Sequence, residues 1–549
     1  MSSTLKRSLD TTADGVLRRK ARNAQLIYED LLDRTGMDGL PVTFVADEGR
    51  RSMLSRACYT SNPFPIPLSL VLTKLRIPAV RKLFEDEIIP QTSAIAAVLT
   101  ACSAAATEIA ALRGADVSNA QIRCDLVFSG LQAIRLYMSD HKHCKEFTSS
   151  RVQSALRVNN ALNGSMHKFR ARDGRDVSFH VYYQSQQEKL VKALGLSKKS
   201  EEYKFFSLKK DMKEIAANVA SRTAMELEDL SFDCGACGCM IRSREEWESS
   251  AVGKAVIAMP LIRTEKLAES EAPDWGRPTE RGPLSGIRVL DLTHIIAGPA
   301  CSRILAEYGA DVLLVRRGDF RHQEQAMLEF DGWAGKHSIQ LDFNIPEQLE
   351  RAKQLIREAD IVTYSYQNGC MDKFGLSEAD IRALNPNVIY SNLNCFSDTV
   401  WKDRPGWAPC AEDITGLSVR NGSLEEPKNL NGVPLDYFPG FILALGTLRA
   451  IAQRLKEGGG YKVTTSLTRG AQYLHECADL CENSEAVPQE SSVAVRSKDK
   501  VWDNVFQYVK GCASGGECGF SSPPVVNTAF PLDERNLVFT DGCTGWSQN

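Results

Sequence analysis

The stretch GIRVLDLTHIIAGPACSRILAEYGADVLLVRR, from Gly286 to Arg317, decides the fold of this 549-residue chain. It contains an apolar strand at 287–292, a short turn, and a helix with a proline near its start and a glycine at its end. A second apolar strand follows at 310–317. This is the order of a nucleotide-binding unit, but the turn lacks the glycine fingerprint that such units usually carry.

The same alternation continues for another eighty residues or so. Strand-like runs at 338–343, 360–366 and 387–396 alternate with amphipathic helical patterns at 346–359 and 377–386. Strands that alternate with helices predict a mostly parallel sheet with helices on both faces. The fold class is therefore α/β.

Composition excludes several classes of protein. A net charge of -3 gives no global field that favours nucleic acid or an anionic membrane. No run of about 18 apolar residues predicts a membrane span. The basic N-terminus has no apolar core, so we expect no secretory signal and a cytoplasmic location. A disordered start is favoured there over a nuclear import signal.

The sixteen cysteines are expected to be reduced, because no signal peptide accompanies them. The cluster CGACGC (234–239) has no second ligand pair at the spacing of a common zinc site, and HECADLC (475–481) lies far away in the sequence. We therefore predict small buried thiols and no metal.

The chain divides into five parts by composition. We expect a disordered N-terminus at 1–25, a first unit at 26–270, a Pro/Gly-rich linker at 271–284, a second unit at 285–475 and an irregular tail at 476–549. Residues 93–126 and 441–467 share one order of an apolar helix, a glycine turn and a strand, which indicates an internal repeat.

Four ordered segments carry a family resemblance. They are THIIAGP (293–299) within the opening stretch, GKHSIQLDF (335–343), the run at 359–397 and GVPLDYFPGFILALGTLRAI (432–451). Together they resemble the family III coenzyme A transferases, which include formyl-CoA and carnitine-CoA transferases and α-methylacyl-CoA racemase. The resemblance covers about residues 283 to 470. It implies a Rossmann-like, mostly parallel large domain and a smaller α+β domain.

The first half resembles the later part of the same family. The segments at 166–181 and 223–262 are similar to its small domain and the stretch that follows. The chain is thus predicted to hold two partial family copies, the first without a recognisable opening. The family forms an interlocked dimer, so we expect either a homodimer or two halves that dock as a pseudo-dimer within one chain.

The resemblance implies a binding site for coenzyme A as a substrate, with no permanently bound cofactor. Helix N-termini and basic side chains at the carboxyl edge of a parallel sheet suit its phosphates. The residues at matching positions are His294, Ile295, Ile296, Ala297, Arg317, Lys336 and Lys373.

Asp436 matches the family's catalytic aspartate. From its position before an apolar helix alone, it would be interpreted as a cap or a dipole partner. The resemblance implies that its carboxylate attacks an acyl-CoA and forms first an anhydride and then an aspartyl-CoA thioester. The partners are then an acyl-CoA and a small carboxylic acid, in a pathway that we expect to belong to secondary metabolism.

Two alternatives stay open at this point. Racemisation uses a histidine in a Gly-His-Asp segment, but the chain has Gly406, Trp407 and Ala408 at that place. The chain also has His337 where the family has arginine. Because of these differences from the family pattern, a non-catalytic protein that binds acyl-CoA is the other alternative. At the position in the first copy that corresponds to Asp436 the chain has Ser93, so a single active site is expected.

Overall fold

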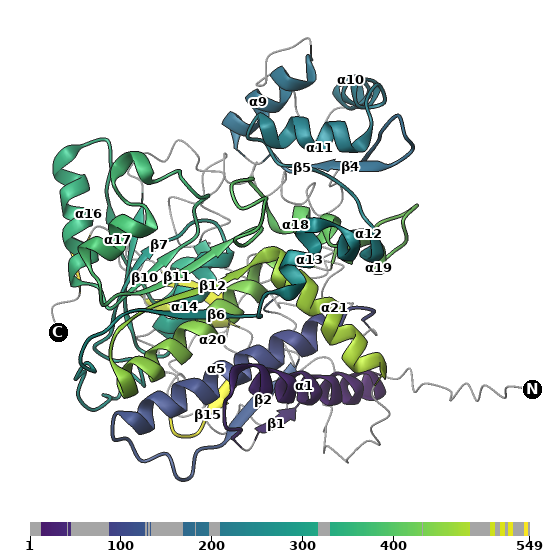
Figure 1. Cartoon of the computed structure of the whole chain (residues 1–549). Coiled ribbons are helices and arrows are strands. Elements are labelled where there is room, and N and C mark those ends of the chain that lie inside the picture. The colour runs from purple at the N-terminus through teal and green to yellow at the C-terminus, as the bar shows by residue number, and fades with distance from the viewer. Residues whose placement is uncertain are drawn as a thin grey trace, which may run out of the picture.

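A computed structural model describes residues 13–40, 42–45, 87–126, 129, 132, 168–181, 183–196, 209–316, 330–430, 432–483, 506–510, 517–521, 525–530 and 543–546 (Figure 1). Its helices are α1 (Ala13–Thr35), α5 (Gln91–Leu112), α9 (Gln184–Leu194), α10 (Lys209–Val219), α11 (Ala224–Asp233), α12 (Arg244–Ser249), α13 (Ala251–Ala258), α14 (Ala297–Glu307), α16 (Pro346–Glu358), α17 (Glu378–Leu384), α18 (Ala408–Ile414), α19 (Leu417–Arg420), α20 (Pro434–Glu457) and α21 (Leu467–Asn483). Two 3-10 helices, η2 (Phe330–Trp333) and η3 (Asp372–Phe374), accompany them.

The central sheet has seven strands in the order β6-β12-β11-β10-β7-β8-β9. They are β6 (Arg263–Ala268), β7 (Arg288–Leu292), β8 (Asp311–Arg316), β9 (His337–Gln340), β10 (Ile361–Tyr364), β11 (Ile389–Asn394) and β12 (Gly460–Ser466). Every neighbouring pair is parallel except β12 and β6. The predicted α/β class with a mostly parallel sheet is confirmed.

The order of the strands creates a switch point between β7 and β10. From β7 the chain proceeds outward through β8 to β9, and it then returns to β10 and proceeds outward in the other direction to β12. In sheets wound in two directions, ligands bind in the crevice at the carboxyl ends of the two strands where the direction changes. The two segments that bound this crevice are those that follow Leu292 and Tyr364.

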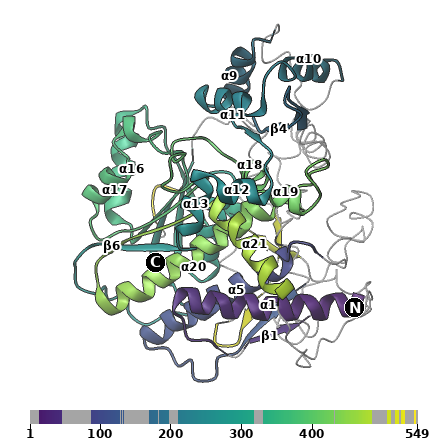
Figure 2. The ribbon, with the colours of Figure 1, turned by 45° about the vertical axis from the view of Figure 1, so that its right-hand side comes forward.

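Helices α5 and α20 form the centre of the apolar core. Both are long and apolar enough to cross a membrane, but 83% and 89% of their apolar windows are buried inside the protein. They lie against each other, with α1 beside α5 and α14 beside α20 (Figures 1 and 2). The two segments of the predicted internal repeat, which contain these helices, therefore pack against each other in the core.

A smaller α+β layer covers one end of the large domain. Strands β3 (Lys168–Arg170), β4 (Asp176–Phe179) and β5 (Gly238–Met240) pair antiparallel, and α9, α10 and α11 lie near them at the top of Figure 1. Helix α12 begins with the predicted cap: Ser243 and Glu246 form a reciprocal capping box.

The predicted division of the chain differs from the structure at the N-terminus and at the linker. Residues 13–25, predicted to be disordered, belong to α1, where Ala21 and Ala24 are buried against α5 and its neighbours. The predicted linker is held in place by Arg113, which donates hydrogen bonds to the carbonyls of Trp275, Gly276 and Pro283. Strand β6 lies before this linker and pairs with β12 after it, so the two predicted units share one sheet.

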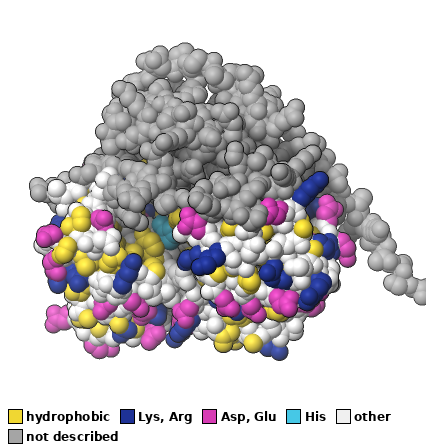
Figure 3. Space-filling view, turned by 90° about the horizontal axis from the view of Figure 1, so that it is seen from above, with side chains coloured by type: hydrophobic (Ala, Val, Ile, Leu, Met, Phe, Trp, Pro, Cys, Tyr) yellow, Lys and Arg dark blue, Asp and Glu magenta, His cyan; other side chains and the backbone are white. Residues whose placement is uncertain are grey.

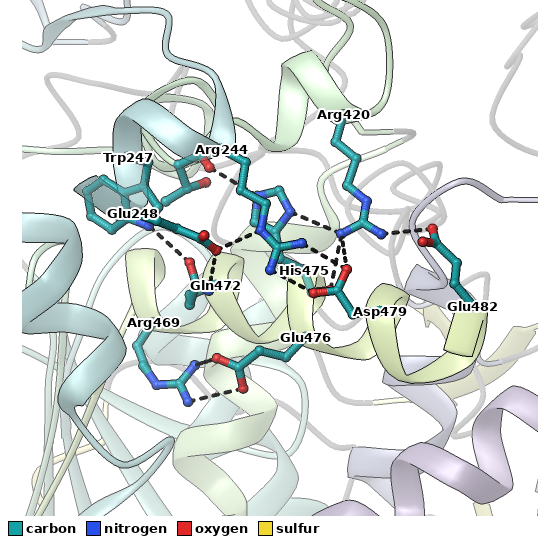
Figure 4. Close-up of polar contacts among 11 residues, drawn as sticks. Arg244, Trp247, Glu248, Arg420, Arg469, Gln472, His475, Glu476, Asp479 and Glu482 are labelled. Carbon is teal, nitrogen blue, oxygen red and sulfur yellow. Dashed lines mark hydrogen bonds and ion pairs between the residues drawn. The ribbon is translucent and has the colours of Figure 1, made fainter. Parts of the chain in front are cut away.

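The predicted start of the tail at 476 falls inside α21. Cys477, Ala478 and Cys481 of this helix are buried. Its polar face is held by ion pairs from other helices: Asp479 accepts from both Arg244 and Arg420, as Figure 4 shows. Among the described residues further on, β13 (Phe506–Lys510) pairs with β14 (Glu517–Ser521), and β15 (Val525–Asn527) joins a small sheet with β2 (Ile122–Asp125) and β1 (Val42–Val45).

The charges on the described surface are mixed in sign. Lysine and arginine side chains alternate with aspartate and glutamate on the face seen from above (Figure 3). This agrees with the small net charge of -3.

A buried ion pair fixes the end of the first strand of the large domain. Asp291 and Lys336 are both fully buried, and the Lys336 ammonium donates to Asp291 at 2.7 Å, to Ser302 at 2.8 Å and to the Pro299 carbonyl at 3.1 Å. Burial alone would raise the pKa of Asp291, but the lysine charge and the hydroxyl donors outweigh it and hold that pKa below its usual value. The pair therefore ties β7, α14 and the segment before β9 together.

We predict that Lys336→Met destabilises the protein by about 3–5 kcal/mol, because the Asp291 carboxylate would remain buried without its counter-charge. The measurement is urea denaturation followed by circular dichroism. The matched control is Arg357→Met, which removes the arginine of the exposed Arg357–Glu350 pair and should change stability little. Equal effects of the two substitutions would contradict the role assigned to the buried pair.

Candidate functional site

Two segments meet at the switch point of the sheet. His294 follows β7, and Ser365 and Tyr366 follow β10. The backbone N–H of His294 donates to the Ser365 hydroxyl at 3.3 Å. The rings of His294 and Tyr366 are stacked, with centroids 4.5 Å apart and an angle of 10° between their planes. The predicted turn thus lies where the strand order places a ligand crevice.

The turn is held in a strained conformation. Ile295 has a φ of +67°, a region that β-branched residues rarely adopt. Such strain persists only where the surroundings enforce it, and it is frequent at functional sites. Gly298 permits the close packing here: a Cβ at this position would lie 2.6 Å from Thr293 Cβ and 2.7 Å from Ser365 Oγ.

Aromatic rings surround His294 on further sides. Trp407, just before α18, lies edge-on to the imidazole at 6.4 Å between centroids, and Tyr183, just before α9, lies 5.6 Å from Trp407. Burial lowers the pKa of His294 to about 4, so the ring is neutral at physiological pH. Its Nδ1 is buried and accepts no hydrogen bond from a described residue. The wall is mostly aromatic with a few polar atoms, which suits an acyl or thioester group.

Asp436 lies in the first turn of α20, beside the strained turn. Gly440, one turn further, is so close to α14 that a Cβ there would lie 2.2 Å from the Ala297 carbonyl oxygen. Tyr437 donates to Asp331 at 3.3 Å and so anchors the start of the helix. The Asp436 carboxylate is half-buried and has no hydrogen bond to any described residue. It is therefore available to a ligand.

A second carboxyl group, Glu412, acts on Asp436. Burial raises the pKa of Asp436 to about 8, and the negative charge of Glu412 adds to the increase. Glu412 is itself buried on α18, with a pKa raised to about 7 by burial, and its Oε2 accepts from Asn429 and from the Leu430 N–H. The two groups form a coupled pair that titrates near neutral pH.

The other sequence-predicted residues have different surroundings. Ile295 and Ile296 are buried, Ala297 begins α14, and Lys373 is exposed, with its ammonium 4.8 Å from the Phe374 ring centroid. Arg317 lies outside the described residues. Contacts of these positions with coenzyme A stay predictions.

The family resemblance predicts a direct contact between Lys336 and coenzyme A. Its ammonium is fully buried and its three donors are already used by Asp291, Ser302 and Pro299. In this arrangement Lys336 acts on the strained turn, and a direct contact would require the ion pair to open. Ser93 of the first copy is also fully buried and donates to the Lys20 carbonyl, so it forms no second site.

Sequence reasoning missed three members of the site. Tyr366 had a usable signal, since it follows a buried strand just as His294 does. Glu412 and Tyr183 had none: only the packing of α18 and of the small layer against the large domain brings them here. Trp407 was identified from the sequence only as a departure from the family pattern.

The chain is similar to known proteins in the same region. Residues 284–504 match the model of "CoA-transferase family III". The chain is 32% identical over 271 residues to an acyl-CoA transferase of Gibberella moniliformis, with 46% of this chain and 47% of that protein covered. It is 32% identical over 197 residues to a formyl-CoA:oxalate CoA-transferase of Escherichia coli, with 34% and 47% covered.

A crystal structure of a CAIB/BAIF family protein from Brucella suis is 26% identical, with a TM-score of 0.33 over 35% of this chain and 55% of that one. The chain spans about half the length of the curated relatives named above. The predicted family resemblance is confirmed for residues 284–504.

We predict that Glu412→Gln lowers the pKa of Asp436 from about 8, because the substitution removes a negative charge that opposes ionisation of the aspartate. The measurement is a carbon-13 NMR titration of labelled aspartate carboxyl groups, with Asp436→Asn to assign the signal. Glu426→Gln, at an exposed position, is the control and should leave the titration unchanged. An unshifted pKa in Glu412→Gln would show that the two carboxyl groups are not coupled.

Proposed function

We propose that this protein is a coenzyme A transferase that moves coenzyme A from an acyl-CoA donor to a carboxylic acid through covalent intermediates on Asp436. The observation that carries the proposal is the place of Asp436: a carboxylate without a hydrogen bond to any described residue, beside the strained turn at the switch point of the sheet. The match of residues 284–504 to the CoA-transferase family supports it.

The chemistry proceeds through four exchanges at carbonyl carbons. The Asp436 carboxylate attacks the donor thioester, and the coenzyme A thiolate leaves an acyl-aspartyl anhydride. The thiolate then attacks the aspartyl carbonyl, giving an aspartyl-CoA thioester and releasing the donor acid. The acceptor carboxylate displaces the thiolate to form a second anhydride, and the thiolate attacks its acceptor carbonyl. Acceptor-CoA leaves and Asp436 is regenerated, with no net proton transfer.

The surrounding groups suit these steps. Neutral His294, Tyr366 and Trp407 offer an apolar enclosure in which water competes poorly with the thiolate. Helices α14 and α20 begin at Ala297 and Pro434, and free N–H groups in the first turn of a helix suit an oxyanion. The raised pKa of Asp436 makes its carboxylate a stronger nucleophile than an ordinary aspartate once it is ionised.

Within this proposal coenzyme A contacts the turn formed by His294 to Ala297, and Arg317 and Lys373 are cationic contacts for its phosphate end. The docked halves supply one complete site per chain, supported by the contact of α5 with α20 and by Tyr183, which the small layer contributes. Glu412 tunes Asp436 and is a positioning residue, since nothing places it in contact with the reacting atoms.

We predict that Asp436→Asn lowers transferase activity by about 10³-fold or more, because an amide cannot form the anhydride. Activity is measured by mass spectrometry with acetyl-CoA or succinyl-CoA as donor and a panel of acids. Hydroxylamine treatment of the wild type incubated with donor should mark Asp436 as a hydroxamate. Full activity in the variant would end the proposal.

The same experiment separates the alternatives. Calorimetry that detects coenzyme A binding, without exchange into any acid, would favour a non-catalytic binding protein. Deuterium uptake at the α-carbon of a branched acyl-CoA would favour racemisation, although Trp407 stands where the racemase histidine is expected.

We also predict that kcat/KM rises with pH up to about 8. The carboxylate form of Asp436 is the nucleophile, and its raised pKa means that this form is scarce at pH 6 and dominant above pH 8. In Glu412→Gln the rising limb should move to lower pH. A flat profile between pH 6 and 9 would show that Asp436 ionises far below the value given by its surroundings.

A further inference from the structure

A group of metal-ligating side chains lies outside the candidate active site, where the small layer meets α18. His180 follows β4, Cys239 belongs to β5, and Cys410 belongs to α18. The His180 ring nitrogen and the two sulfur atoms all lie within 4.8 Å of one another, and all three residues are buried. They come from segments separated by up to 230 positions in sequence.

A fourth candidate ligand, a carboxylate oxygen, lies beside the same group. Asp413, on α18, is fully buried, and its Oδ2 lies 3.6 Å from His180 Nε2. Its Oδ1 accepts no hydrogen bond from a described residue and has the Lys168 ammonium 3.8 Å away. A fully buried carboxylate oxygen without a hydrogen-bond donor has a lone pair that a metal ion can take up.

We propose that His180, Cys239, Cys410 and Asp413 form a structural zinc site that fastens the small layer to α18. Two thiolates, one imidazole and one carboxylate are ligands that Zn²⁺ prefers, and a four-ligand site without an open position is structural. In a tetrahedral zinc site the ligand atoms lie about 3.3–3.8 Å apart. The ligand atoms of His180, Cys239 and Cys410 would therefore move toward one another by about 1 Å when the ion binds.

The charges balance around this site. Two thiolates and the Asp413 carboxylate bring three negative charges, of which zinc neutralises two and Lys168 the third. Zinc binds cysteine as the thiolate, so its binding releases the two thiol protons.

Ser178 lies at the centre of the group and acts as an outer partner. Its hydroxyl donates to Asp413 Oδ2 at 2.6 Å and lies 3.3 Å from Cys239 Sγ and 3.1 Å from His180 Nε2. A hydrogen bond of this kind orients a carboxylate ligand. For the ion to bind, the Ser178 hydroxyl would have to rotate away from the centre of the group.

The site would influence the active site through α18. Cys410 and Asp413 flank Glu412 on this short helix, and Trp407 stands at its start. Zinc would therefore hold the helix that positions both the tuning carboxyl group and one wall of the aromatic enclosure. The CGACGC segment (234–239) has no second pair of ligands nearby in the sequence. The fold brings Cys239 of this segment together with His180 and Cys410 from other segments.

The test is the metal content of the full chain, produced without a histidine tag in zinc-supplemented medium and measured by plasma mass spectrometry. We expect about one zinc per chain, and at least a tenfold lower content in Cys239→Ser and in Cys410→Ser. Cys102→Ser is the matched control: Cys102 is fully buried on α5, its thiol donates to the Phe441 carbonyl, and serine keeps that donor. The control should retain the metal.

Cobalt exchange provides a second measurement that does not depend on the folding of the variants. Cobalt added to zinc-depleted wild type should give thiolate-to-cobalt charge-transfer absorption and a higher Tm. A wild type that neither retains zinc nor takes up cobalt overturns the proposal. Stoichiometric zinc in both ligand variants overturns it as well, since the metal would then be bound elsewhere. Both readouts are independent of transferase activity.

Discussion

The buried pair of Asp291 and Lys336 is the constraint on which the site depends. It joins the carboxyl end of β7 to α14 and to the segment that leads into β9, and the Ser302 hydroxyl also donates to Asp291. A turn with Ile295 in the left-handed region is unfavourable by itself, and it persists because its two flanks are held in this way. The ion pair thus fixes the turn at the carboxyl edge of the sheet.

The chemistry of the crevice arises from several segments that are remote in sequence. Asp436 comes from the first turn of α20, Glu412 from α18, and Tyr183 from the small layer. Burial opposes ionisation of both carboxyl groups, and each would hinder ionisation of the other. An aspartate with a pKa near 8 is the result of this packing, because an exposed aspartate ionises near 4.

Sequence patterns succeeded where hydrophobic periodicity and local caps decide the structure. The strands at 310–317, 360–366 and 387–396 are present as β8, β10 and β11, and the cap at Ser243 is formed. Sequence patterns failed where contacts between segments far apart in the sequence decide the structure. Residues 13–25 look polar, yet Ala21 and Ala24 are buried because α5 covers them. The buried ion pair between Lys336 and Asp291 has no signal in the sequence either.

By itself the sequence determined the alternation of strands and helices, the turn at 293–299 and the resemblance that selects Asp436. These features depend on neighbouring residues and on ordered motifs, both of which can be recognised in the sequence. Only the tertiary structure decided that His294 stacks on Tyr366, that Glu412 raises the pKa of Asp436, and that cysteines from two segments meet a histidine from a third. Such effects depend on distance and burial, which arise when segments far apart in sequence pack against one another.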